Sequence, residues 1–202
     1  MSSEPAAVAP IPVEAPPVEA RIVSVGAYLL AASATFFFIS FLFAFFYLRE
    51  VNSAGLWGGP TPKHHVSVPT SGGVAILVCV LLSVVLVRFA VQELRGGGRG
   101  LWWTAGVAGL LLGLAAVAIQ CWQYTDLAFG TEEGGYASVY LGWTGFFTIF
   151  AFVAMLWLET ILATAKRSPG TSQEPDLASF SVVWVTLGLV EIAAFILLYG
   201  VK

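Results

Sequence analysis

The stretch WVTLGLVEIAAFILLYG, residues 184–200, is apolar throughout except for Thr186, two glycines and one carboxyl group, Glu191. A helix rises about 1.5 Å per residue, so an apolar run of about 20 residues crosses the roughly 30 Å hydrocarbon core of a membrane. Extended to residues 177–201, the stretch has this length. It therefore predicts a membrane-spanning helix with a buried acid.

The composition of the whole chain supports the same environment. Of its 202 residues 58% are hydrophobic and only 10% are charged, and the mean hydropathy is +0.86. A soluble domain has about 25% charged residues, so this chain lacks the polar residues to cover a globule. The net charge of −3 gives no basic footprint for nucleic acid, and we expect no such partner.

Five apolar runs are long enough to cross a bilayer as helices, and none alternates as the strands of a barrel would. They are residues 23–48, 71–91, 101–127, 138–165 and 177–201. The sequence predicts an all-α integral membrane protein whose five-helix domain covers residues 23–202. Residues 1–22 are rich in Pro, Ala and Glu, and we expect a disordered cytoplasmic tail there rather than a signal peptide.

Lys and Arg residues predict the orientation, because cytoplasmic loops carry an excess of them. Five spans put the N-terminus and the second and fourth connectors on one side. That side has six basic residues against three on the other. They are Arg21, Arg88, Arg95, Arg99, Lys166 and Arg167 against Arg49, Lys63 and Lys202. We expect the N-terminus inside and the C-terminus outside.

Three spans carry a stripe of small and weakly polar residues at steps of three or four. Such stripes are typical of helix-facing surfaces in membranes. They are Gly26, Ser33, Ser40 and Tyr47 on the first span, Gly106, Gly109, Gly113, Ala116, Gln120 and Gln123 on the third, and Ser181, Trp184, Gly188 and Glu191 on the fifth. The stripes favour helix packing. A substrate path is the alternative, but it needs several ionisable groups at membrane depth.

Only Glu191 is an ionisable group deep inside a span. A charge at the bilayer centre costs on the order of 3 kcal/mol, and no Lys or Arg of the chain is expected at its depth. We expect a neutral acid, or one paired with a donor on another helix or another chain. The predicted interhelical or partner contacts are Glu191, Gln120, Gln123, Trp184 and Gly188.

The chain carries few candidate ligands for a redox metal. Haem and copper in membranes are held mainly by His and Cys, and the two histidines, His64 and His65, are neighbours in one polar connector. Cys79 and Cys121 lie in apolar runs, where Cys behaves as a small hydrophobic residue. We expect no catalytic, cofactor-binding or metal-binding residue on this chain. It has the character of a non-catalytic membrane subunit or a small transporter.

Several segments, in order along residues 23–202, resemble one family. They are VSVGAYLLAASATFFFISFLFAFFYLRE (23–50), GLWGGPTP (55–62), QCWQYTDL (120–127), YASVYLGWTGF (136–146) and the closing span with Trp184. Together they resemble subunit III of the haem–copper (cytochrome c) oxidases in its bacterial five-helix form.

The sequence departs from that family at its intramembrane polar positions. By the resemblance, family acids fall on Ala34, Gln123 and Gly188, and family histidines on Phe147, Phe150 and Val185. Glu191 lies one helical turn beyond Gly188 on the same stripe. We hypothesise that it replaces the missing acid and hydrogen-bonds to Gln123 or Gln120. The alternative, that it faces another subunit or a water pocket, stays open.

The resemblance implies a non-catalytic subunit that stabilises catalytic subunit I of a respiratory oxidase, beside subunit II, in the bacterial plasma membrane. The complex would couple electron transfer to oxygen with proton translocation, with haem and copper in the partner subunits. The family also implies phospholipid in a cleft between the first two helices and the rest, and a cytochrome bc-type complex is a further candidate partner. Arg88, Arg95 and Arg99 are candidate contacts to lipid headgroups, although the positive-inside bias explains them equally well.

Two other functions remain open. A relative that serves nitric oxide reductase or oxidase assembly would show a similar loss of polar residues, and its co-purifying partner would distinguish it. A small transporter would show an inverted repeat and a polar site at the midplane. Five spans do not divide into equal halves, which argues against a transporter.

Overall fold

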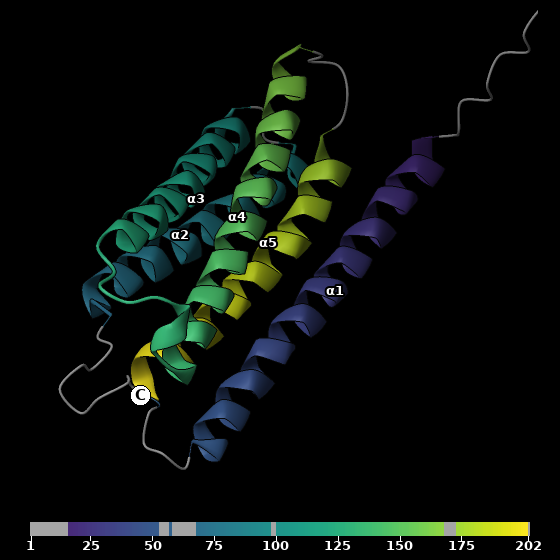
Figure 1. Ribbon diagram of the computed structural model, residues 1–202. Helices are drawn as coiled ribbons and strands as arrows, with labels where there is room; N and C mark the ends of the chain where they lie inside the picture. Colours follow the sequence, from purple (N-terminus) through teal and green to yellow (C-terminus); the bar gives the residue numbers. More distant parts are fainter. Residues whose placement is uncertain (1–15, 53–56, 58–67, 98–99, 168–172, 202) are drawn as a thin grey trace, which may run out of the picture.

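The computed structural model describes residues 16–52, 57, 68–97, 100–167 and 173–201, without the side chains of residues 16, 17, 19 and 132. These residues form a bundle of long helices (Figure 1). The helices are α1 (Pro16–Val51), α2 (Thr70–Arg95), α3 (Leu101–Thr125), α4 (Gly135–Arg167) and α5 (Glu174–Phe195). A 3₁₀ turn, η1 (Thr131–Glu133), precedes α4, and a π-helical turn, η2 (Ile196–Gly200), continues α5.

All five helices are long and apolar enough to cross a membrane, which confirms the predicted five-helix membrane bundle. The largest difference is at the start of α1. It begins at Pro16 rather than Val23, so residues 16–22, expected in a disordered tail, are helical. Proline is favoured in a first helical turn because the amide hydrogen it lacks would have no partner there. Residues 1–15 lie outside the described part of the chain.

Helix α5 is central to the bundle. The main contacts of α1 are with α5 and α4, whereas α2 packs against α3 and α5. Figure 1 shows α1 at one edge and α2 with α3 at the other. The expected cleft between the first two helices and the rest is therefore wrong for this chain, because α1 and α2 do not stand together as a separate pair.

The packed face of α1 differs from the predicted stripe. Gly26, Ser33, Ser40 and Tyr47 are exposed, and the buried face consists of Ala27, Ala31, Ala34, Phe38 and Phe45. The Ser40 hydroxyl donates to the Phe37 carbonyl of its own helix at 2.6 Å. A hydroxyl satisfied in this way can face lipid at little cost, so a weakly polar residue need not mark a packing face.

Glycines of α3 allow its neighbours to approach closely. A Cβ atom on Gly106 would lie 2.8 Å from the Leu162 side chain of α4. One on Gly109 would lie 3.1 Å from Val87 of α2. Small residues permit this close contact between membrane helices, where packing replaces the hydrophobic drive. Helix α3 is thereby held between α2 and α4.

Candidate functional site

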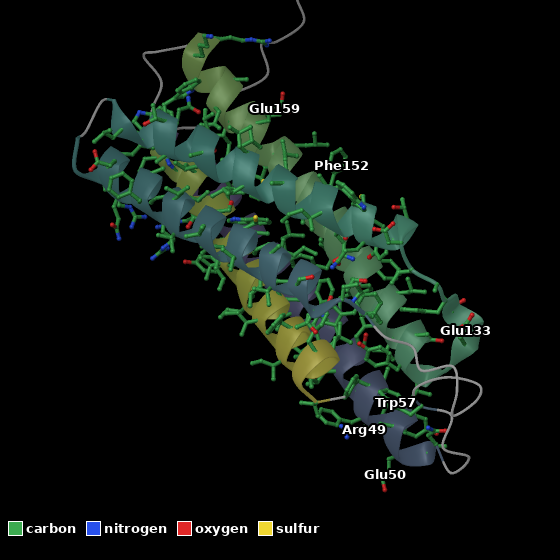
Figure 2. The ribbon with its side chains drawn as sticks, turned by 90° about the vertical axis from the view of Figure 1, so that its left-hand side faces the viewer. Arg49, Glu50, Trp57, Glu133, Phe152 and Glu159 are labelled. Carbon is green, nitrogen blue, oxygen red and sulfur yellow. The ribbon has the colours of Figure 1, made fainter. Side chains whose placement is uncertain are left out.

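The two ends of the bundle differ in their side chains. We call one the Tyr136 end, where α1 finishes, α4 begins and η2 lies, and the other the Arg95 end, where α2 finishes and α5 begins. Figure 2 shows Arg49, Trp57 and Glu133 toward the Tyr136 end and Glu159 toward the opposite end. At the Tyr136 end, Arg49 of α1 donates to the carbonyl of Val201 at 2.7 Å, so the last helix is anchored to the first.

A buried hydrogen-bond chain links α5, α2 and α3 in the middle of the bundle. Trp184 Nε1 donates to Ser83 Oγ at 3.0 Å, and Ser83 Oγ donates to the carbonyl of Gly109 at 2.6 Å. Trp184 and Ser83 are completely enclosed. The sequence pointed to Trp184 but not to Ser83. The only signal for Ser83 was a single hydroxyl within an aliphatic run.

Gly188 lies one turn beyond Trp184 on the same face of α5. A Cβ atom there would lie 3.0 Å from Val84 of α2. The absent side chain lets α5 and α2 meet at this level. The position where the family resemblance places an acid is thus a close helix contact in this chain.

Glu191 is buried, with 7% of its surface exposed. Within the described residues its carboxyl group makes no hydrogen bond, so the structure does not contain the hypothesised bond to Gln123 or Gln120. Its electrostatic neighbours are the hydroxyl groups of Tyr140 and Tyr199, which lie 3.4 Å from each other. These two tyrosines were not singled out by the sequence.

The two glutamines of α3 point into the same region. Gln120 is buried beside the Tyr140 hydroxyl, and its Nε2 has no hydrogen-bond partner in the described part of the chain. The same holds for both polar atoms of Gln123. The Gln123 amide occupies the space where Gly72 of α2 has no side chain. Both residues therefore face neighbouring helices.

The π-helical turn sets the position of Tyr199. The Tyr136 hydroxyl, at the start of α4, donates to the carbonyl of Leu198 at 2.7 Å. The ring of Tyr199 lies over Gly73, where a Cβ atom would approach it to 2.5 Å. Single π turns often occur at functional sites. Here the turn brings the Tyr199 hydroxyl to 3.4 Å from the Tyr140 hydroxyl of α4.

Basic residues line a cavity of about 220 Å³ at the Arg95 end, between α1, α2 and α5. Its polar side chains are Ser24, Tyr28, Arg88, Arg95 and Ser179. Arg95 Nε lies 2.8 Å from Glu174 Oε1 in an exposed ion pair, and such pairs contribute little to stability. Arg99, the third predicted headgroup contact, lies outside the described residues.

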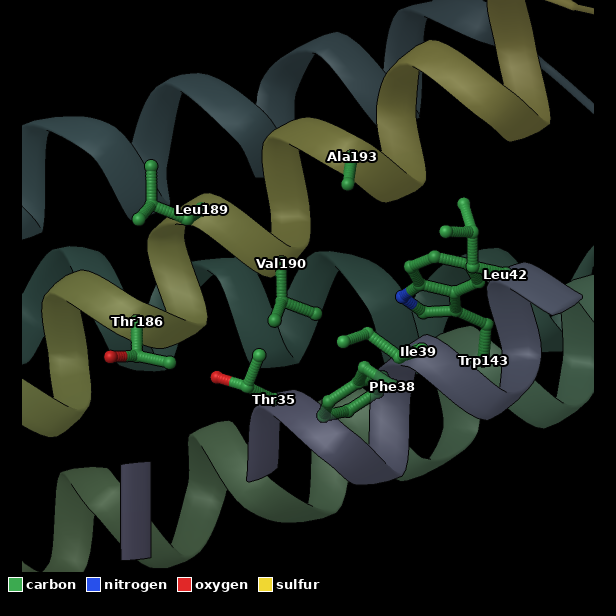
Figure 3. A pocket seen from close by; sticks show the side chains of 9 residues that line it. All are labelled: Thr35, Phe38, Ile39, Leu42, Trp143, Thr186, Leu189, Val190 and Ala193. Atoms are coloured by element: carbon green, nitrogen blue, oxygen red, sulfur yellow. The ribbon is translucent and has the colours of Figure 1, made fainter. Parts of the chain in front are cut away.

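A second cavity of about 220 Å³ opens between α1, α4 and α5 (Figure 3). Its lining is apolar except for Thr35, Thr186 and the indole of Trp143. Both threonine hydroxyls donate to carbonyls of their own helices, at 2.8 and 3.0 Å. Trp143 Nε1 has no partner among the described residues. The cavity therefore suits an apolar chain rather than a polar ligand.

No group of three or more His, Cys, Asp or Glu side chains within the described ranges is arranged to hold a metal ion. His64 and His65 lie outside those ranges. Cys79 is half-buried and Cys121 is exposed, and neither is in a disulfide.

Comparison with known proteins gives a consistent result. The family model described as cytochrome c oxidase subunit III matches residues 16–169. Cytochrome c oxidase subunit 3 of Rattus norvegicus is 28% identical over 153 residues, which are 73% of this chain and 57% of the rat protein. That of Xenopus laevis is 25% identical over 189 residues, 91% of this chain and 71% of the relative. The similarity to these proteins is low but covers most of the bundle.

Proposed function

The chain belongs to the cytochrome c oxidase subunit III family, and from this premise we propose that it is the non-catalytic subunit III of a respiratory haem–copper oxidase. The observation that carries the proposal is the family match over residues 16–169, which includes all of α1 to α4. The chain spans little more than half the length of the rat relative, so its role in a whole complex is our inference.

In this role the chain stabilises the catalytic subunit I, beside subunit II, as a rigid helical brace. Its own interior is closed by the Trp184–Ser83–Gly109 chain and by glycine contacts on α3, which support rigidity. Haem and copper belong to the partner subunits. The bundle thus contributes surface and stability to a complex that couples electron transfer to oxygen with proton translocation.

Phospholipid is a second partner in this proposal. Arg88 and the hydroxyls of Ser24 and Ser179 at the Arg95 end offer a positive charge and hydrogen-bonding groups to an anionic headgroup. The apolar cavity of Figure 3 offers a place for an acyl chain. The two cavities lie beside α1 and α5, and they take the place of the cleft expected from the family resemblance.

We also propose the setting of the complex. The excess of basic residues at the Arg95 end supports a cytoplasmic position for that end and an external position for the Tyr136 end, in a bacterial plasma membrane. A supercomplex with a cytochrome bc-type complex fits the same role.

The test is purification of the tagged full chain from its native membrane in mild detergent. We expect a haem-bearing chain with the absorption changes of a haem–copper oxidase on reduction, and oxygen consumption in the purified fraction. A nitric oxide reductase in place of the oxidase would favour the related-reductase alternative. Solute flux in liposomes that contain only this chain would favour a transporter, and either result would contradict the proposal.

A further inference from the structure

One acidic side chain on the outer surface of α4 has no polar partner within the described ranges. Glu159 is exposed, and its carboxyl group makes no ion pair or hydrogen bond there. The large side chains near it on the exposed side of α4 are apolar, namely Ile149, Phe152, Val153 and Leu156. Figure 2 shows Glu159 and Phe152 on the same outer side of α4. A single carboxyl group therefore lies on an apolar surface of a membrane helix.

Contacts between α3 and α4 show how deep Glu159 lies along the bundle. Two contacts set the register of these helices, that of Gly106 with Leu162 and that of Gly113 with Met155. Because the residue numbers rise along α3 and fall along α4, the helices are antiparallel and Glu159 lies at the level of Gly109. The Gly109 carbonyl accepts the hydrogen bond from Ser83 in the middle of the bundle. Glu159 therefore lies outside the bundle at the level of that buried bond.

Two exposed tryptophans on α3 indicate the two surfaces of the bilayer. Trp103 and Trp122 are exposed, and Trp is enriched at both membrane interfaces. They are separated by about 28 Å along the helix, close to the roughly 30 Å of the hydrocarbon core. Trp122 Nε1 donates to Asp126 at 2.9 Å, so its polar edge is directed to the helix end. Gly109, and with it Glu159, lies about 9 Å inside the level of Trp103. The structure thus adds a second acid at membrane depth to Glu191.

No basic side chain in the described part of the chain pairs with this carboxyl group. Lys166 and Arg167 lie about 10 and 12 Å farther along α4, and Arg88 and Arg95 are on α2, whose main contacts are with α3 and α5. A charge near the bilayer centre costs on the order of 3 kcal/mol, and ionisable groups within spans normally pair with a protein group. The Glu side chain also lacks the long stem with which Lys and Arg reach the headgroups. Glu159 therefore requires a partner from outside the chain.

The other polar groups on this face are satisfied within α4. The Thr160 hydroxyl donates to the Trp157 carbonyl at 2.7 Å, and the Thr164 hydroxyl donates to the Thr160 carbonyl at 2.8 Å. The outer face of α3 differs, because the helix has no Asp, Glu, Lys or Arg between its two exposed tryptophans and exposes aliphatic residues such as Leu111. The α3 face therefore suits lipid, whereas the α4 face suits a surface with a group complementary to a carboxylate.

We propose that the outer face of α4 around Glu159 docks a transmembrane helix of a partner subunit, and that this helix places a Lys or Arg side chain opposite the carboxyl group. The long apolar stems of Lys and Arg let their charge reach this depth. Exclusion of water from the interface strengthens the attraction between the two charges. The outer face of α3 meets lipid. The inference rests on the proposed role as a subunit of a membrane complex, but it does not require that complex to be an oxidase.

The first arm of the test is photo-crosslinking in the native membrane. Benzoylphenylalanine replaces Leu156, which is exposed on α4 one helical turn from Glu159. The matched control carries the same probe at Leu111, which is exposed on α3 at nearly the same depth. We expect the probe at Leu156 to link to a partner's membrane helix, which mass spectrometry identifies as one that contains a Lys or Arg, and the probe at Leu111 to label lipid. A probe at Leu156 that labels only lipid or a second copy of this chain would overturn the proposal.

The second arm removes the carboxyl group. We expect Glu159→Leu to weaken retention of this chain in the purified complex, on dilution in detergent, by more than about tenfold, because the partner's cation then lacks its counter-charge. Glu50→Leu is the control, because Glu50 is an exposed acid near the end of α1. Thermal unfolding of the separated chain should be the same for both variants, since neither acid is packed inside the bundle. Unchanged retention of Glu159→Leu would refute the pairing.

The results separate this inference from the proposed function. A haem-bearing partner that co-purifies without a cross-link from Leu156 would contradict the docking face and leave the proposed function standing. A cross-linked partner helix in a complex without haem would contradict the proposed function and leave the docking face standing.

Discussion

Trp184 of α5 donates its indole hydrogen to the hydroxyl of Ser83 on α2 across 3.0 Å, at a level where neither side chain is exposed. The Ser83 hydroxyl in turn donates its own hydrogen to the Gly109 carbonyl of α3 at 2.6 Å. One hydroxyl thus connects three helices. Because lipid offers no alternative partner at this depth, the three helices are held in one register.

Ser83→Ala removes both bonds and leaves the Trp184 N–H buried without a partner. An unpaired buried group costs about 1–3 kcal/mol, so we expect the free energy of unfolding to fall by about that amount. Thermal unfolding of the purified chain in detergent measures it. The control is Ser40→Ala, where the exposed hydroxyl bonds only to its own helix, and equal effects of the two changes would contradict this role.

Two buried tryptophans make a matched comparison. Trp143 Nε1 has no partner in the described part of the chain, whereas Trp184 Nε1 has one. Replacement by Phe therefore breaks a hydrogen bond only at Trp184. We expect Trp184→Phe to lower the free energy of unfolding by about 1 kcal/mol more than Trp143→Phe. The reverse order, measured under the same detergent conditions, would show that the indole bond is not important.

Gly109→Leu places a large side chain between α3 and α2, where Val87 and the Ser83 carbonyl lie 3.1 and 3.4 Å from a Cβ atom. Overpacking costs about 1–3 kcal/mol, and it also separates Ser83 from its acceptor. We expect loss of stability and a lower yield of folded chain by size-exclusion chromatography. Gly26→Leu is the control, since nothing lies within 4 Å of its Cβ position. If Gly109→Leu left the stability and the folded yield unchanged, close packing of α2 and α3 at this level would be contradicted.

Arg88→Gln removes a charge from the cavity at the Arg95 end. An exposed charge pair contributes at most about 1 kcal/mol, which is roughly fivefold in affinity. We expect anionic phospholipid retained by the purified complex to fall by about that factor, as measured by mass spectrometry. Arg21→Gln serves as the control, because Arg21 is exposed on α1 and does not line this cavity. Equal retention of anionic phospholipid by the two variants would show that Arg88 is not part of the lipid site.

The number and type of helices could be predicted because each span is a long apolar run, and lipid leaves helices as the solution for such runs. The buried face of α1 could not be predicted in this way. Its alanines resemble lipid-facing residues in sequence, and its serines can satisfy themselves within their own helix, as Ser40 does. The start of α1 was missed for a related reason, since residues 16–22 are helical without being strongly apolar.

The candidate site was predicted in part. Sequence spacing placed Glu191, Gln120 and Gln123 on inward faces but could not give their partners, which depend on side-chain directions and on three other helices. The Tyr199 hydroxyl, which lies 3.4 Å from that of Tyr140, is positioned by the π turn. No periodic pattern predicts that turn. Ser83 was missed because a single hydroxyl in an aliphatic run does not by itself indicate a buried hydrogen bond between helices.

The central claim is that this subunit supports an oxidase without holding a redox centre of its own. The most direct test is to dissociate the purified complex, separate this chain from the remaining subunits, and measure haem and copper in both fractions. We predict that all haem and copper stay with the remaining subunits and that the separated chain keeps its helical circular dichroism. Haem or copper that travels with this chain in fixed proportion would contradict the claim.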